Sequence, residues 1–195
     1  AELGGLGVRV DVSKEADTQA MAAAALERYG RIDGLINNAG IYSSLVPKPF
    51  EEIALDEWRA VYDVNVLGMF LATRAVVPAM RAAGFGRIVN IASGTPYKGV
   101  PFLLHYVTSK GAVITLTRAI AKEVAADGIL INTFAPGFTM SAGVIATPVQ
   151  VQNLPQLPPQ SPLTPPPQSP ADLRRPAPAS PPPAPDLPPR HPPPC

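Results

Sequence analysis

The sequence predicts an α/β fold in which helices cover both faces of a parallel β-sheet. Short apolar runs rich in β-branched residues alternate with helical patterns of twelve residues or more, which is typical of strands joined by crossover helices. Polar or turn-forming residues follow three of these runs, at Asn38, Ser93 and Pro136. Prolines gather towards the C-terminus, which limits the predicted fold to residues 1–147.

Four apolar runs are predicted to form strands, at residues 6–12, 35–37, 86–91 and 130–134. The second breaks at the run Asn37-Asn38-Ala39-Gly40, and the fourth ends at a Pro136-Gly137 turn. In open parallel sheets, ligands bind outside the carboxyl ends of the strands. The polar residues at these ends are therefore candidates for a functional site.

Three longer segments are predicted to form helices, at residues 13–29, 56–82 and 104–126. Ser13 would cap the first helix and Gly30 would end it, because serine is a good N-cap and glycine a good C-cap. Asp56 would cap the second helix. Asp127 and Gly128 would close the third.

Residues 148–195 form a proline-rich tail that is predicted to be disordered. Six of the 26 prolines lie at or before Pro136 and the other 20 lie in this tail, which has no aromatic side chain. Such a segment cannot bury enough apolar surface to offset the entropy lost on ordering. Residues 175–181 (Arg-x-x-Pro-x-x-Pro) and 185–190 (Pro-x-x-Pro-x-Arg) fit the two orientations of an SH3 ligand. One alternative is therefore an interaction protein that works through its tail.

Charge and cysteine content argue against several classes of protein. The net charge is +1, which gives no reason to expect a nucleic-acid or membrane partner. The chain has neither the uninterrupted apolar stretch of a membrane span nor an opening signal peptide. The one cysteine, Cys195, cannot form an intrachain disulfide, so we expect a cytoplasmic location. No metal site is predicted.

The pattern that carries chemistry is Tyr106 and Lys110, preceded by Ser93. Residues four apart share one helix face, so the phenol and the ammonium are expected to project the same way. A neighbouring ammonium favours the phenolate and would lower the pKa of Tyr106. Such a tyrosine could exchange a proton with an alcohol or carbonyl oxygen, which Ser93 could also hydrogen-bond.

Together these residues resemble the short-chain dehydrogenase/reductase family. The resemblance covers residues 5–147 and rests on the Asn-Asn-Ala-Gly run, on the spacing of Ser93, Tyr106 and Lys110, and on Asn65 and Pro136-Gly137. It implies an oxidoreductase that transfers hydride between NAD or NADP and a small secondary alcohol or ketone.

The resemblance also implies a role for each matching residue. In the catalytic set, Tyr106 is the acid/base, Lys110 lowers its pKa and holds the nicotinamide ribose, Ser93 orients the substrate oxygen, and Asn65 holds a water of the proton relay. The cofactor contacts, besides Tyr106 and Lys110, are Asp11 and Val12 along the adenine, Asn38, Ala39 and Gly40 at the adenosine ribose, and Pro136, Gly137 and Thr139 over the nicotinamide.

One part of the family pattern is not found in the sequence. The family begins with a strand and a turn of the form Thr-Gly-x-x-x-Gly-x-Gly, whose amide groups hold the pyrophosphate at a helix N-terminus. We therefore expect a Rossmann-like, doubly wound parallel sheet that is incomplete, N-terminally truncated, with the first two and the last strands missing. Strand 35–37 would then have an open edge. A further alternative is an inactive, truncated fragment. Relatives form homo-oligomers, but the sequence leaves the oligomeric state, the choice between NAD and NADP, and the substrate open.

Overall fold

The computed structural model describes residues 4–137, which are built around a three-stranded parallel sheet. Its strands are β1 (Gly34–Asn37), β2 (Gly86–Ile91) and β3 (Ile129–Phe134), in the order β1-β2-β3. The register pairs Leu35 with Ile88, and Ile88 with Ile131. The predicted parallel sheet is therefore confirmed, and β1 lies at an edge of it within the described part of the chain.

Helical segments connect these strands. They are α1 (Glu15–Tyr29), the 3₁₀ turn η1 (Phe50–Glu52), α2 (Leu55–Tyr62), the π-helical turn η2 (Asp63–Leu67), α3 (Gly68–Ala83), α4 (Thr95–Lys98), α5 (Leu104–Val124) and the 3₁₀ turn η3 (Ala125–Asp127). The predicted helix at residues 56–82 is thus a run of α2, η2 and α3 with a π turn inside it.

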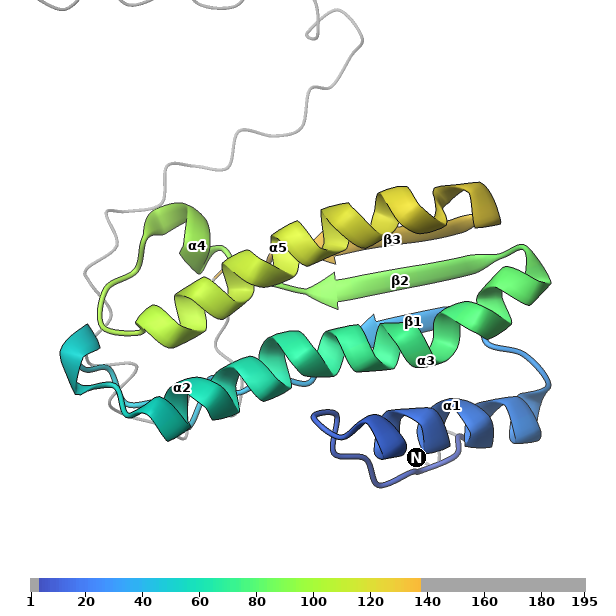
Figure 1. Ribbon diagram of the computed structural model, residues 1–195, viewed down its shortest axis with the longest axis horizontal. Coiled ribbons are helices and arrows are strands. Elements are labelled where there is room, and N and C mark those ends of the chain that lie inside the picture. Colours follow the sequence, from blue (N-terminus) through green and yellow to red (C-terminus); the bar gives the residue numbers. More distant parts are fainter. Residues whose placement is uncertain (1–3, 138–195) are drawn as a thin grey trace, which may run out of the picture. The chain divides into compact units, whose positions relative to one another are not determined.

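Helices α3 and α5 lie over the same face of the sheet, and α1 packs beside α3 (Figure 1). Side chains on that face are buried, among them Ile88 and Ile131. The opposite face exposes Ile36, Leu130 and Phe134. Helices for this second face, which the strand–helix alternation predicts, do not occur among residues 4–137.

The main hydrophobic core fills the space between the sheet and these helices. Its buried members are Ala22, Val76, Val77, Met80, Ile88, Val124, Ile129 and Ile131. They come from α1, α3, α5, β2 and β3, so burying them in one cluster fixes the helices against the sheet. This packing sets the position of the carboxyl ends of the strands.

Three local predictions were wrong. Residues 6–12 form no strand, because an extended segment needs a neighbouring strand to pair its amides and none lies beside it in the described structure. Ser13 does not cap α1, which begins after Lys14; its hydroxyl instead donates to Oδ1 of Asp11 at 2.6 Å. Asp56 lies inside the first turn of α2, whose N-cap is Ala54.

One helical stretch meets the length and composition of a membrane span, namely Leu55–Ala83, taken through α2, η2 and α3. The core helix of a soluble protein meets the same criteria, and 44% of the most apolar part of this stretch is buried inside the fold. The stretch also supplies several residues of the main core.

Candidate active site

The first turns of α5 place Tyr106 and Lys110 on one buried face. Tyr106 is 7% exposed and Lys110 is 4% exposed. The Nζ atom of Lys110 lies 5.9 Å from the centre of the Tyr106 ring. The shared face that the four-residue spacing predicts is therefore present in the structure.

Ser93 lies two residues after the end of β2 and reaches the same place. Its hydroxyl lies close enough to the Tyr106 phenol to lower the pKa of that phenol. The Ser93 oxygen also accepts hydrogen bonds from the Thr95 amide at 3.2 Å and from the Thr95 hydroxyl at 3.1 Å. Thr95 thus fixes the serine rotamer, and the two hydroxyls meet at the carboxyl end of β2.

The electrostatics of Tyr106 differ from the prediction. Burial raises the pKa of Tyr106, the hydrogen bond with Ser93 lowers it, and the nearby hydroxyl of Tyr42 raises it further. The expectation that Lys110 lowers this pKa was wrong for this structure. The ammonium donates at 2.8 Å to the carbonyl of Ile91, and burial is the largest cause of the raised pKa.

Burial has the opposite effect on Lys110 and lowers its pKa from 10.5 to about 8. At neutral pH the side chain is therefore still mainly a cation. A buried ammonium with one carbonyl acceptor retains two further N–H donors, which suits it to bind hydroxyl groups of a ligand.

Asn65 lies in the π turn η2 and is fully buried. Its Oδ1 accepts from the amide of Ile41 at 2.7 Å, while its Nδ2 donates to the carbonyl of Ile41 at 3.2 Å and to the hydroxyl of Ser109 at 3.1 Å. The side chain therefore ties the segment after β1 to α5. Single π turns occur frequently at functional sites, and this one turns Asn65 towards Lys110 and Ser109.

The Asn38-Ala39-Gly40 segment follows β1 and passes next to this group. A Cβ atom at Gly40 would lie 3.2 Å from Oδ1 of Asn65 and 3.5 Å from Nζ of Lys110. A Cβ atom would be tight against the Asn65 oxygen, whereas its distance to Lys110 is an ordinary van der Waals contact. The structure thus brings Gly40 together with the predicted catalytic residues.

A second region contains the residues predicted to contact adenine. Val12, Asn38 and Ala39 line one pocket, which is open to solvent and otherwise mainly apolar. Val12 packs so closely against α3 that a Cβ atom at Gly68 would come within 2.8 Å of its Cγ2. Asp11 does not line this pocket; its carboxylate accepts from the backbone and hydroxyl of Ser13, which holds its pKa below the usual range.

The residues predicted to lie over the nicotinamide are only partly described. The carbonyl of Pro136 accepts a hydrogen bond from the amide of Gly94 at 3.1 Å, so the end of β3 lies beside the end of β2. Gly137 is the last described residue, and Thr139 lies outside the described part of the chain.

Sequence reasoning missed two side chains that belong to this region. The ring of Tyr42 lies 4.7 Å from that of Tyr106, centre to centre, at a tilt of 41°. Ser109 links Asn65 to the Tyr106 carbonyl, which its hydroxyl contacts at 2.7 Å. Ser109 was visible in the sequence as the residue before Lys110, but nothing local to Tyr42 indicates that it packs on a residue 64 positions later.

Acidic, histidine and cysteine side chains do not gather in threes or more anywhere within residues 4–137, so that stretch offers no metal-binding cluster. The chemistry of the site therefore rests on one phenol, one ammonium and hydroxyl and amide groups. This combination can exchange a proton with a bound oxygen and can hold neutral hydroxyl groups.

Comparison with known proteins agrees with the geometry. The sequence model of the family described as short chain dehydrogenase matches residues 3–150. Among curated proteins, 2-(R)-hydroxypropyl-CoM dehydrogenase of Xanthobacter autotrophicus is 43% identical over 132 residues, which cover 68% of this chain and 53% of that protein. Levodione reductase of Leifsonia aquatica is 39% identical over 152 residues, covering 78% of this chain and 54% of the reductase. The chain spans about half the length of these relatives.

Solved structures show the same likeness. A NAD⁺-bound xylitol dehydrogenase superposes with a TM-score of 0.63 at 36% identity, covering 66% of this chain and 49% of that chain. The structure of ElxO with NADP bound superposes with a TM-score of 0.68 at 32% identity, covering 71% and 55%. Both kinds of nicotinamide cofactor thus occur among the structural relatives.

Proposed function

The chain belongs to the short-chain dehydrogenase family, and we propose that it provides the catalytic part of an oxidoreductase acting on a secondary alcohol or ketone with NAD or NADP. The observation that carries this proposal is the meeting of Ser93, Tyr106 and Lys110 in one buried group at the carboxyl end of β2. Three segments of the chain converge to build it, namely the end of β2, the start of α5 and the turn after β1.

Tyr106 is the proton donor in the reductive direction and the proton acceptor in the oxidative one. Its raised pKa keeps the phenol protonated at neutral pH, so the ligand-free group is set to donate to a carbonyl oxygen. Ser93 lies close enough to the phenol to lower its pKa and has a rotamer held by Thr95, so it can orient the same substrate oxygen. Both residues are only 7% exposed, which limits the access of competing water.

Lys110 binds the cofactor ribose through the N–H groups that the Ile91 carbonyl leaves available. Asn65 fixes the segment that carries Gly40, which allows the ribose-binding turn to lie close to Lys110. The predicted water of the proton relay would lie near Asn65, whose side-chain amide is itself engaged with Ile41 and Ser109.

The residues present fit one half of the cofactor well. The close approach at Gly40, the cation at Lys110 and the pocket lined by Val12, Asn38 and Ala39 are suited to ribose and adenine. When bound, the nicotinamide supplies or accepts the hydride, and in its oxidised form it adds a positive charge that favours the phenolate. Pro136 and Gly137 would lie over that ring, and the sequence contains no glycine-rich turn for the pyrophosphate.

Cofactor binding and turnover test the proposal separately. NADH and NADPH fluorescence titrations of the full chain should show binding that Tyr106→Phe retains and that Lys110→Met weakens by about tenfold or more, because a charge-assisted hydrogen bond is lost. Turnover of a secondary alcohol should fall by about 100-fold or more in Tyr106→Phe, which removes the acid/base group.

The matched control is Tyr97→Phe, since Tyr97 is an exposed tyrosine on α4. It should leave both binding and turnover unchanged. Absence of binding by either dinucleotide in the unmodified chain would contradict the proposal and favour the inactive fragment. A cytoplasmic location and a homo-oligomeric state stay predictions; gel filtration tests the second.

A further inference from the structure

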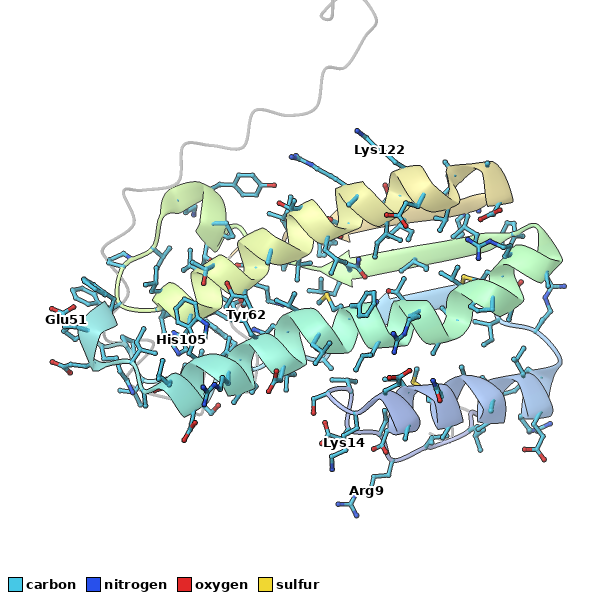
Figure 2. The ribbon with its side chains drawn as sticks, in the orientation of Figure 1. Arg9, Lys14, Glu51, Tyr62, His105 and Lys122 are labelled. Atoms are coloured by element: carbon cyan, nitrogen blue, oxygen red, sulfur yellow. The ribbon has the colours of Figure 1, made fainter. Side chains whose placement is uncertain are left out.

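A buried histidine lies immediately before Tyr106 and is not needed for the proposed chemistry. His105 is fully buried at the start of α5 and faces α2 (Figure 2). Its Nε2 atom lies 3.3 Å from Oε1 of Glu57, on α2. The other oxygen of Glu57 accepts from Nζ of Lys48 at 2.7 Å. One carboxylate thus connects α2, α5 and the loop after β1.

Charge fixes the direction of these contacts. The hydrogen bond and charge of Lys48, and to a smaller extent His105, hold the pKa of Glu57 below its ordinary value. An ionised carboxylate only accepts, so Nε2 of His105 carries the proton. The second ring nitrogen, Nδ1, is buried and has no hydrogen-bond partner among the described residues. The orientation of the imidazole therefore depends on Glu57.

The loop held by Lys48 is the one that covers Tyr106. The Lys48 amide donates to the Phe102 carbonyl at 2.9 Å, so the loop is joined to the segment that leads into α5. Leu45 of the same loop is buried with Tyr106, and the Tyr42 ring packs on the Tyr106 ring. Two of the side chains that pack with Tyr106, Tyr42 and Leu45, thus come from the loop that contains Lys48, while Val61 and Leu103 complete the cluster.

We propose that Lys48, Glu57 and His105 form a clamp that positions the loop of residues 41–49 and thereby sets the packing of Tyr42 on Tyr106. The three are positioning residues: they act on the site through the loop. This proposal rests on the proposed function, because it concerns the surroundings of the tyrosine proposed as the acid/base. The clamp makes the side of Tyr106 that faces this loop an aromatic and apolar wall, formed by Tyr42 and Leu45.

The test uses the full chain and the variants Glu57→Ala, Glu57→Gln and Lys48→Met. Amide hydrogen exchange measures the loop, and ring-carbon NMR of labelled tyrosine measures the titration of Tyr106. Glu57→Ala should speed exchange of the Lys48 amide by about tenfold or more, because the loop opens locally. It should also lower the pKa of Tyr106 towards its ordinary value, because the cover that raises it is loosened.

Two comparisons separate positioning from general stability. Glu57→Gln keeps one of the two acceptor oxygens, so its exchange should be intermediate between that of the unmodified chain and that of Glu57→Ala, whereas Lys48→Met should resemble Glu57→Ala. Asp56→Asn is the matched control, because Asp56 is the neighbouring, 96% exposed carboxylate that pairs with Arg59 on the surface of α2. It should change neither readout.

If Glu57→Ala changes neither the exchange rate of the Lys48 amide nor the pKa of Tyr106, the clamp is overturned. Faster exchange that extends equally to β2 would overturn it as well, because the group would then support only the fold as a whole. Neither readout requires cofactor. If the unmodified chain fails to bind NADH or NADPH while the exchange results hold, the proposed function fails and the clamp stands. In an active chain, Glu57→Ala should lower kcat and leave the KM for the cofactor unchanged.

Discussion

Replacing Lys110 with methionine should change how the free energy of unfolding depends on pH. Lys110 is 4% exposed, and burial lowers its pKa from 10.5 to about 8. Between these two values the unfolded chain binds more protons than the folded one, so this group makes stability rise with pH there. Below pH 8 the folded chain carries the full penalty of a buried cation, and above about 10.5 the penalty is gone.

The size of the effect follows from the shift. A difference of about 2.5 pKa units corresponds to about 3 kcal/mol, of which about 2.5 kcal/mol is relieved between pH 7 and pH 10. Lys110→Met cannot titrate, so its stability relative to the unmodified chain should fall by about that amount over the same range. Any part of the lost hydrogen bond to the Ile91 carbonyl that does not depend on pH cancels when the differences at the three pH values are compared.

Urea unfolding followed by the fluorescence of Trp58, at pH 7, 8.5 and 10, measures this difference. Lys122→Met is the matched control, because Lys122 is an exposed lysine on the same helix (Figure 2). Its stability difference from the unmodified chain should stay constant to within about 0.5 kcal/mol. A pH-independent difference for Lys110→Met would show that the Lys110 ammonium is not buried as the structure has it, and the reasoning would be refuted.

Two further substitutions test the packing around this cation. Gly40→Ala places a Cβ atom 3.2 Å from Oδ1 of Asn65, so we expect a loss of about 1–2 kcal/mol in the free energy of unfolding; Gly5→Ala, which meets nothing within 4 Å, should have no such effect. Asn65→Ala leaves the buried hydroxyl of Ser109 and both backbone groups of Ile41 without this partner, so thermal unfolding should show a loss of about 2–3 kcal/mol. Wild-type stability in either variant would contradict the buried network.

The sequence was sufficient for elements whose neighbours lie within residues 4–137. Strand β2 and helix α5 begin where they were predicted, because β2 pairs on both sides and α5 packs on the sheet. Residues 6–12 have the same apolar, β-branched character, yet they form no strand since no neighbour offers them hydrogen bonds. Whether a segment with strand propensity forms a strand therefore depends on an available pairing partner as well as on its own sequence.

The site shows the same division between local and distant information. The spacing of Tyr106 and Lys110 correctly places them on one face, because helix geometry is local. The spacing does not predict which group accepts the hydrogen bond of the ammonium. In the structure the acceptor is the carbonyl of Ile91, 19 residues earlier in the chain. Tyr42 was missed for the same reason, since its packing on Tyr106 depends on how a loop folds back over α5.

Lys110 and Asn65 should have opposite effects on the free energy of unfolding at neutral pH. This contrast tests whether Lys110 serves the ligand or the fold. The buried cation lowers the stability of the folded chain at neutral pH, whereas the Asn65 amide satisfies three partner groups and raises it. Methionine fills similar space without the cost of burying a charge, so the Lys110 cation is unfavourable for the fold alone. If Lys110→Met proves as stable as the unmodified chain at pH 7, or more stable, and binds NADH more weakly, the charge serves the ligand. If Lys110→Met is less stable by as much as Asn65→Ala and binds NADH normally, Lys110 is a structural residue and the proposed ribose contact is wrong.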